Sequence, residues 1–159
     1  MAKYFILVFT FFSLQYFAQV RNYKTINDTV FNVGDIIRLP QSEYSLCHPT
    51  LRPSVIDSLR PIAVFIKAHL NIKFEISSYT DSRGSIADNI KFSQGLADNI
   101  RGYFIQDFQL SKEQLSAKGY GESQPIYTDD AIAKVKTREE KELMHQENRR
   151  IELKIIAIK

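Results

Sequence analysis

The spacing of apolar residues after Pro53 predicts a helix. Large apolar side chains recur there at steps of three and four residues, which places them on one face of an α-helix. The residues of this face are Val55, Leu59, Ile62, Ile66 and Leu70. Pro53 suits the first turn because a residue at that position needs no N–H for a helical hydrogen bond. The pattern therefore predicts a helix that begins at Pro53 and ends near Asn71.

Alternation of apolar and polar residues predicts the strands. It is clearest over residues 72–79, where Ile72, Phe74 and Ile76 share one face. Residues 35–39, 115–118 and 149–158 are also predicted as strands, from their alternation and their β-branched residues. A polar, proline-containing stretch over residues 40–52 predicts a loop between the first strand and the first helix.

Two further helical segments follow from the pattern. A second helix is expected over residues 85–106, with Phe92, Ile100 and Phe104 on one face. Residues 130–146 are rich in charge and predict a helical insertion before the last strand. The resulting order is β-α-β-α-β, a helical excursion, then β. Because strands joined through a helix pair in parallel, this order predicts an α+β two-layer sandwich with the helices on one face of a mixed sheet.

The N-terminus has the composition of an export signal. Lys3 precedes a nearly unbroken apolar run over residues 4–12, and Ala18 is a small residue at a suitable cleavage position. We expect residues 1–18 to be a signal peptide, residues 19–29 a short leader and residues 30–159 one folded domain. A membrane anchor is the alternative, but Ser13 and Gln15 interrupt a run that should contain ~20 mainly apolar residues. No transmembrane segment is expected after cleavage.

Charge and reactive side chains point away from several function classes. The net charge is only +3 without a dense basic cluster, which argues against nucleic-acid binding. The lone Cys47 is expected to be buried or available to another chain. The three histidines lack the spacing of metal ligands, and no serine lies in a nucleophile motif. We therefore expect no enzyme activity, no metal and no cofactor.

Three segments, in order, carry a family resemblance. They are Tyr79-Thr80-Asp81-Ser82-Arg83-Gly84, Gly119-Tyr120-Gly121-Glu122-Ser123-Gln124-Pro125 and Asn148-Arg149-Arg150-Ile151-Glu152-Leu153. With Asn89 and Phe92-Ser93 between them, they resemble the OmpA-like C-terminal, peptidoglycan-associating domain family over residues 30–157. The family has the element order β-α-β-α-β-β. The charged insertion over residues 130–146 resembles the Bacteroidetes-type subgroup.

The resemblance implies a ligand and a site. The family binds the diaminopimelate side chain of peptidoglycan stem peptides, whose terminal carbon carries an ammonium and a carboxylate. In the family an aspartate at the position of Asp81 meets the ammonium, and an arginine fifteen residues later meets the carboxylate through two hydrogen bonds. This chain has Leu96 there, which implies weakened binding and predicts that Leu96→Arg raises affinity. Thr80 and Asn89 are implied neighbours of the ligand, although Asn89 could equally brace the loop.

Another cation could replace the missing arginine. Arg101 is rejected, because it lies five residues past Leu96 and therefore ~140° around the helix, away from the site. Arg83 lies in the loop of Asp81, but we do not expect it to be the replacement, because many relatives carry it together with the helix arginine. Arg149 and Arg150 start the last strand and point to opposite sides, and Arg150 is the candidate we favour. Asp81 could alternatively serve only its own turn, by accepting backbone N–H groups.

The resemblance therefore predicts a non-enzymatic envelope protein that binds peptidoglycan non-covalently through Thr80, Asp81, Asn89 and Arg150. The alternative is a degenerate OmpA-like scaffold that acts in protein–protein interaction in the cell envelope. An exported, periplasmic location follows from either hypothesis, with association to the outer membrane as a further option.

Overall fold

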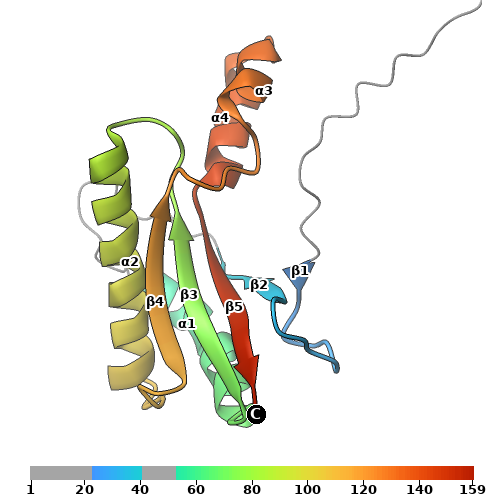
Figure 1. Cartoon of the computed structure of the whole chain (residues 1–159), viewed down its shortest axis with the longest axis vertical. Coiled ribbons are helices and arrows are strands. Elements are labelled where there is room, and N and C mark those ends of the chain that lie inside the picture. Colours follow the sequence, from blue (N-terminus) through green and yellow to red (C-terminus); the bar gives the residue numbers. More distant parts are fainter. Residues whose placement is uncertain (1–22, 41–52) are drawn as a thin grey trace, which may run out of the picture.

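The computed structural model describes residues 23–40 and 53–159 (Figure 1). The elements are β1 (Tyr23–Lys24), β2 (Ile36–Arg38), α1 (Pro53–Ala68), β3 (Ile72–Tyr79), α2 (Ile86–Gln106), β4 (Leu115–Gly121), α3 (Asp129–Lys134), α4 (Arg138–Asn148) and β5 (Arg150–Ile158). The predicted signal peptide, the first part of the leader and Cys47 lie outside the described residues.

One mixed sheet holds the five strands in the order β1-β2-β5-β3-β4. β3 and β4 pair in parallel across α2, as a strand-helix-strand unit requires. β5 lies antiparallel between β2 and β3. The strands that flank α1 therefore run in the same direction without being neighbours. The C-terminal strand is thus central, and its first residues lie beside the end of β3.

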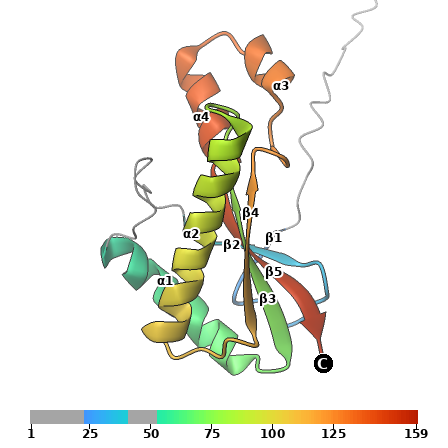
Figure 2. The ribbon, with the colours of Figure 1, turned by 60° about the vertical axis from the view of Figure 1, so that its left-hand side comes forward.

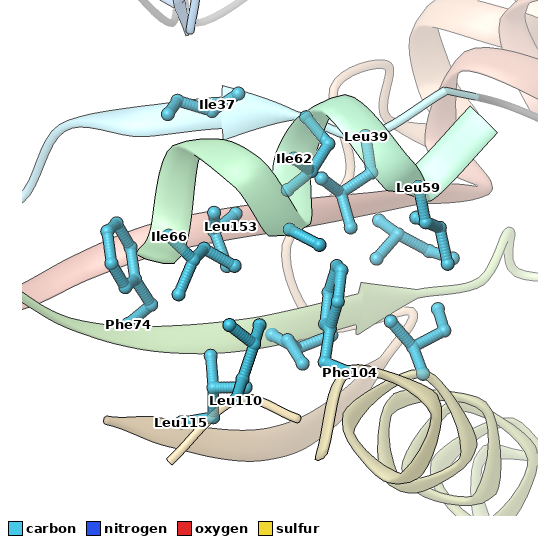
Figure 3. Close-up of a cluster of buried hydrophobic side chains, with 14 of the residues drawn as sticks. Ile37, Leu39, Leu59, Ile62, Ile66, Phe74, Phe104, Leu110, Leu115 and Leu153 are labelled. Carbon is cyan, nitrogen blue, oxygen red and sulfur yellow. The ribbon is translucent and has the colours of Figure 1, made fainter. Parts of the chain in front are cut away.

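The core fills the space between the sheet and two helices. Figure 2 shows α1 and α2 on the same side of the sheet. Leu59 and Ile66 of α1 are fully buried against Phe74 of β3, Leu153 of β5 and Phe104 of α2 (Figure 3). Burying such side chains contributes about 1.5–3 kcal/mol each. This layer confirms the predicted α+β sandwich with helices on one face.

A glycine sets how closely α2 approaches β4. A Cβ built on Gly119 would lie 2.2 Å from the backbone nitrogen of Gln94. The helix and strand are also joined there, because the N–H of Gly119 donates to Gln94 Oε1 at 2.8 Å and the N–H of Gly121 donates to Ser93 Oγ at 2.9 Å. Any larger residue at position 119 would push α2 away from the sheet.

The structure corrects several element predictions. The insertion forms two helices, because Thr137 caps a new one by accepting from the N–H of Glu140. Leu70 is 79% exposed, since α1 ends at Ala68 and Leu70 falls in the following turn. The two-residue strand β1 was not predicted, because two residues show no periodicity. β4 runs on to Gly121, three residues beyond its predicted end.

Candidate functional site

The candidate site lies at the end of the sheet where β3 and β4 finish and β5 begins (Figure 1). Asp81 follows β3, and Ser85 caps the N-terminus of α2 by accepting from the N–H of Asp88. Helices α3 and α4 extend beyond the same end of the sheet. The turn after β3, the start of α2 and the end of α4 therefore converge there.

Asp81 is a buried carboxylate with two roles. Its side chain is 7% exposed. Oδ1 accepts the backbone N–H of Arg83 at 3.0 Å, which closes the turn. Oδ2 accepts Nε of Arg83 at 3.1 Å, Nη2 of Arg83 at 2.7 Å and Nη1 of Arg149 at 2.5 Å. Asp81 thus serves its own turn and also holds two guanidinium groups.

A second carboxylate, that of Glu142 on α4, binds the same two arginines. Arg83 Nη1 donates to Oε2 at 2.9 Å, and Arg149 Nη2 donates to Oε1 at 2.9 Å. The side chains of Arg83 and Glu142 are each 52% exposed, while that of Arg149 is 27% exposed. We call Asp81, Arg83, Arg149 and Glu142 the arginine–carboxylate cluster. Its two positive and two negative charges balance.

The cluster shifts the acidity of its members. Burial raises the pKa of Asp81, but the hydrogen bonds from Arg83 and Arg149 outweigh burial and leave that pKa below its usual value. Hydrogen bonds from Arg83 and then Arg149 lower the pKa of Glu142. The hydrogen bond to Asp81 raises the pKa of Arg83. Both carboxylates are therefore ionised at neutral pH.

Asn89 braces the site without reaching the Asp81 carboxylate. Its Nδ2 donates to the backbone carbonyl of Asp81 at 3.3 Å and to Glu122 Oε2 at 2.6 Å. The side chain thereby joins the turn after β3, helix α2 and the segment after β4. Thr80 donates its backbone N–H to the carbonyl of Gly121, and its buried hydroxyl has no hydrogen-bond partner among the described residues.

The structure brings Arg149, rather than the favoured Arg150, to Asp81. Arg150 is 2% exposed, and its Nε donates to the buried Glu152 Oε1 at 2.7 Å. Its other donors bind the carbonyls of Asn148 and Gln124, and its guanidinium carbon lies 3.8 Å from the centre of the Tyr79 ring. These contacts occupy Arg150 inside the scaffold.

The phase of β5 explains why the two arginines separate. Arg149 is in phase with Ile151 and Leu153, which face the helices, whereas Arg150 is in phase with Glu152. The turn that carries Asp81 leads from β3 toward α2, on the helix-covered side. The sequence predicted that the two side chains point to opposite sides, but it did not show which of them lies beside Asp81. No sequence pattern singled out Glu142, because it is one of many acidic residues in a charged helix.

Leu96 is part of the core. Its side chain is 3% exposed and lies in the same buried cluster as Ala97 and Ile100. Arg101, set aside from its helical phase, donates to the carbonyls of Leu115 and Lys112. Within residues 23–40 and 53–159, no group of three or more His, Cys, Asp or Glu side chains is placed to hold a metal ion. No helix in those residues is long and apolar enough to cross a membrane.

Comparisons with known proteins agree with the fold. Outer membrane protein P5 of Haemophilus influenzae is 30% identical over 109 residues, which cover 69% of this chain and 30% of P5. Peptidoglycan-associated lipoprotein of Buchnera aphidicola is 33% identical over 69 residues, covering 43% of this chain and 39% of the lipoprotein. This chain thus spans well under half the length of these relatives.

One solved structure has a similar fold. The periplasmic domain of Helicobacter pylori MotB superposes with a TM-score of 0.60 at 17% identity, covering 80% of this chain and 79% of that domain. The family model described as the OmpA family matches residues 48–139, which is more than half of the chain. The chain therefore belongs to the OmpA family.

Proposed function

We propose that this protein is a non-enzymatic, exported envelope protein that binds peptidoglycan non-covalently through the arginine–carboxylate cluster. Family membership supports a role at the cell wall, since one relative is named a peptidoglycan-associated lipoprotein. The relatives' names also place them at the outer membrane or with peptidoglycan, which supports a periplasmic location. The single observation that carries the proposal is the buried Asp81 carboxylate beside two partly exposed guanidinium groups.

This geometry suits a carbon that bears both an ammonium and a carboxylate. Asp81 supplies the anion for the ammonium, and Arg83 and Arg149 supply cations for the carboxylate. Arginine is the residue best suited to bind a carboxylate with two parallel hydrogen bonds. The side chain of meso-diaminopimelate in a peptidoglycan stem peptide ends in such a carbon. Arg83 and Arg149 would thus replace the arginine that the family resemblance places at position 96.

The remaining predicted site residues take supporting roles in this proposal. Asn89 holds the backbone of Asp81 in place through the 3.3 Å hydrogen bond to its carbonyl. The Thr80 hydroxyl has no partner among the described residues, but it is buried and would have to be uncovered before it could contact the ligand's peptide. Arg150 acts indirectly, by fixing the start of β5 directly after Arg149, the residue that caps the end of α4.

Asp81→Asn tests the proposal. Losing a hydrogen bond to a charged group, worth ~1.5–3 kcal/mol, should weaken binding of a diaminopimelate-containing tripeptide by about tenfold to a hundredfold. Calorimetric titration gives the affinity, and co-sedimentation with purified sacculi gives wall binding. Asp107→Asn is the matched control, because Asp107 is an exposed aspartate at the far end of α2.

Two results would count against the proposal. Equal affinity of Asp81→Asn and the unchanged protein, both folded by circular dichroism, would remove Asp81 from the site. Failure of the unchanged protein to bind the tripeptide or sacculi would favour the protein-interaction scaffold instead. The specific observation behind that alternative is that the cluster already balances its own charges.

A further inference from the structure

Glu142 occupies the side of the two guanidinium groups that a ligand carboxylate would need. Arg83 directs Nη1 and Nη2 to the Glu142 carboxylate, at 2.9 and 3.4 Å, while its Nε and Nη2 bind Asp81. Arg149 is divided in the same way, with Nη1 on Asp81 and Nη2 on Glu142. Each arginine therefore bridges an inner carboxylate and an outer one.

The inner and outer carboxylates differ in how firmly they are held. Asp81 is 7% exposed and fixed in a turn, whereas Glu142 is 52% exposed and reaches the arginines from α4. Ion pairs with partners this exposed are weak in water. The buried carboxylate therefore belongs to the permanent framework, and the exposed one is replaceable.

Space is available for the Glu142 side chain to leave. A surface hollow of about 370 Å³ lies against α4 and is lined by Arg138, Glu139, Glu142 and Leu143. Glu142 thus lies between the cluster and this hollow. A rotation of its side chain would release the outer side of both guanidinium groups without moving the sheet.

We propose that Glu142 is an internal competitor for the ligand's carboxylate, so that α4 sets the affinity and the selectivity of the cluster. This inference rests on the proposed peptidoglycan site and deepens it. In the free protein, Glu142 neutralises the arginines. A ligand with both an ammonium and a carboxylate displaces Glu142, whereas a ligand with the ammonium alone leaves it in place.

The inference predicts a selective gain when the competitor is removed. Glu142→Gln should bind a tripeptide with diaminopimelate at its third position about twofold to tenfold more tightly than the unchanged protein, as expected from losing weak surface ion pairs. A tripeptide with lysine at that position keeps the ammonium but lacks the carboxylate. Its affinity for Glu142→Gln should stay equal or fall.

Glu139→Gln is the matched control. It removes the same charge from the same helix, one turn away, and Glu139 is exposed. Its affinity for the diaminopimelate tripeptide should match that of the unchanged protein. Backbone amide shifts of Glu142 and Leu143 in the unchanged protein give a second readout, because both should move when the diaminopimelate tripeptide saturates the site.

The outcomes separate the two proposals. If the unchanged protein binds and Glu142→Gln binds no more tightly, Glu142 is not a competitor, while the peptidoglycan site stands. The inference would also be overturned if Glu142→Gln bound the lysine tripeptide more tightly by the same factor, or if Glu139→Gln gained the same affinity for the diaminopimelate tripeptide. Either result would mean that the lost negative charge, and not competition by Glu142, raises affinity. Binding by Glu142→Gln alone would support competition by Glu142, but it would count against peptidoglycan binding by the unchanged protein. If neither protein binds, the peptidoglycan site itself fails, and the inference with it.

Discussion

Arg149 and Arg150 are neighbours in the sequence but belong to two different regions of the molecule. Arg150 is enclosed with Glu152 on the face of the sheet opposite the helices, where both side chains are at most 1% exposed. Arg149 lies at the end of the sheet in the arginine–carboxylate cluster, where its side chain is 27% exposed. We call Arg150 and Glu152 the scaffold pair, and the ring of Tyr79 packs against Arg150.

The difference shows that adjacent residues of one sequence motif can have different roles, one in stability and one in binding. A buried charge that loses its partner is costly, because the remaining charge stays away from water. Less stability is lost when the charge is partly exposed, as in Arg83, Arg149 and Glu142, or keeps a second partner, as the buried Asp81 keeps Arg83 when Arg149 is removed. The scaffold pair should therefore control folding, and the cluster should control binding. Substitutions in each region test this division.

The largest effect is expected from Arg150→Met. The change leaves the Glu152 carboxylate buried without its guanidinium partner and should lower the free energy of unfolding by about 3–5 kcal/mol. Urea denaturation measures the loss. Adding Glu152→Leu to the same protein removes the stranded charge, so the double variant should be more stable than Arg150→Met. A single variant as stable as the unchanged protein would contradict the assignment of Arg150 to the scaffold.

Leu96→Arg should cause the next largest loss of stability. From the sequence this variant was expected to raise affinity, whereas the structure leads us to expect mainly a loss of stability. Because Leu96 is buried at 3% exposure in the core, an arginine there should lower the free energy of unfolding by about 2–4 kcal/mol. Affinity for the diaminopimelate tripeptide should not rise, since Arg83 and Arg149 already supply cations. Leu96→Met is the control, with a cost below about 1.5 kcal/mol. A stable variant with clearly tighter binding would restore the expectation from the family pattern.

The sequence was informative where a repeated pattern had physical meaning. Period two over residues 72–79 and period three to four over residues 85–106 gave β3 and α2 almost to the residue. The division of the insertion was also encoded, because Thr137 and Glu140 have the spacing of a helix cap. The pairing of β1 with β2 was not, since it depends on contacts between segments and involves two residues of each strand.

Part of the site was also predictable from sequence patterns. Asp81 follows from the motif, and strand phase separates Arg149 from Arg150. Glu142 depends on where α4 lies above the end of the sheet, which no local pattern determines. For Leu96 the family pattern identified the position in the sequence. Only the packing in the structure shows that its side chain belongs to the core.

The smallest loss of stability is expected from Arg149→Gln, which tests the role of the arginine–carboxylate cluster. At pH 7 the change should lower the free energy of unfolding by at most about 1 kcal/mol, while binding of the diaminopimelate tripeptide falls about tenfold or more. Arg138→Gln removes the same charge from an exposed position on α4 and should leave binding unchanged. A stability loss as large as that of Arg150→Met would end the distinction between the two regions.

Acid titration sharpens this last prediction. The pKa values of Asp81 and Glu142 are lowered in the folded protein from ordinary values of 3.8 and 4.5. Their contribution to stability is therefore complete above those values and is lost as pH falls below them, through the lower folded pKa values. Arg149→Gln weakens the cause of both shifts, so urea midpoints measured from pH 6 to pH 3 should fall less steeply in the variant. Arg138→Gln should follow the unchanged protein, and parallel curves for all three proteins would mean that Arg149 does not stabilise the ionised carboxylates.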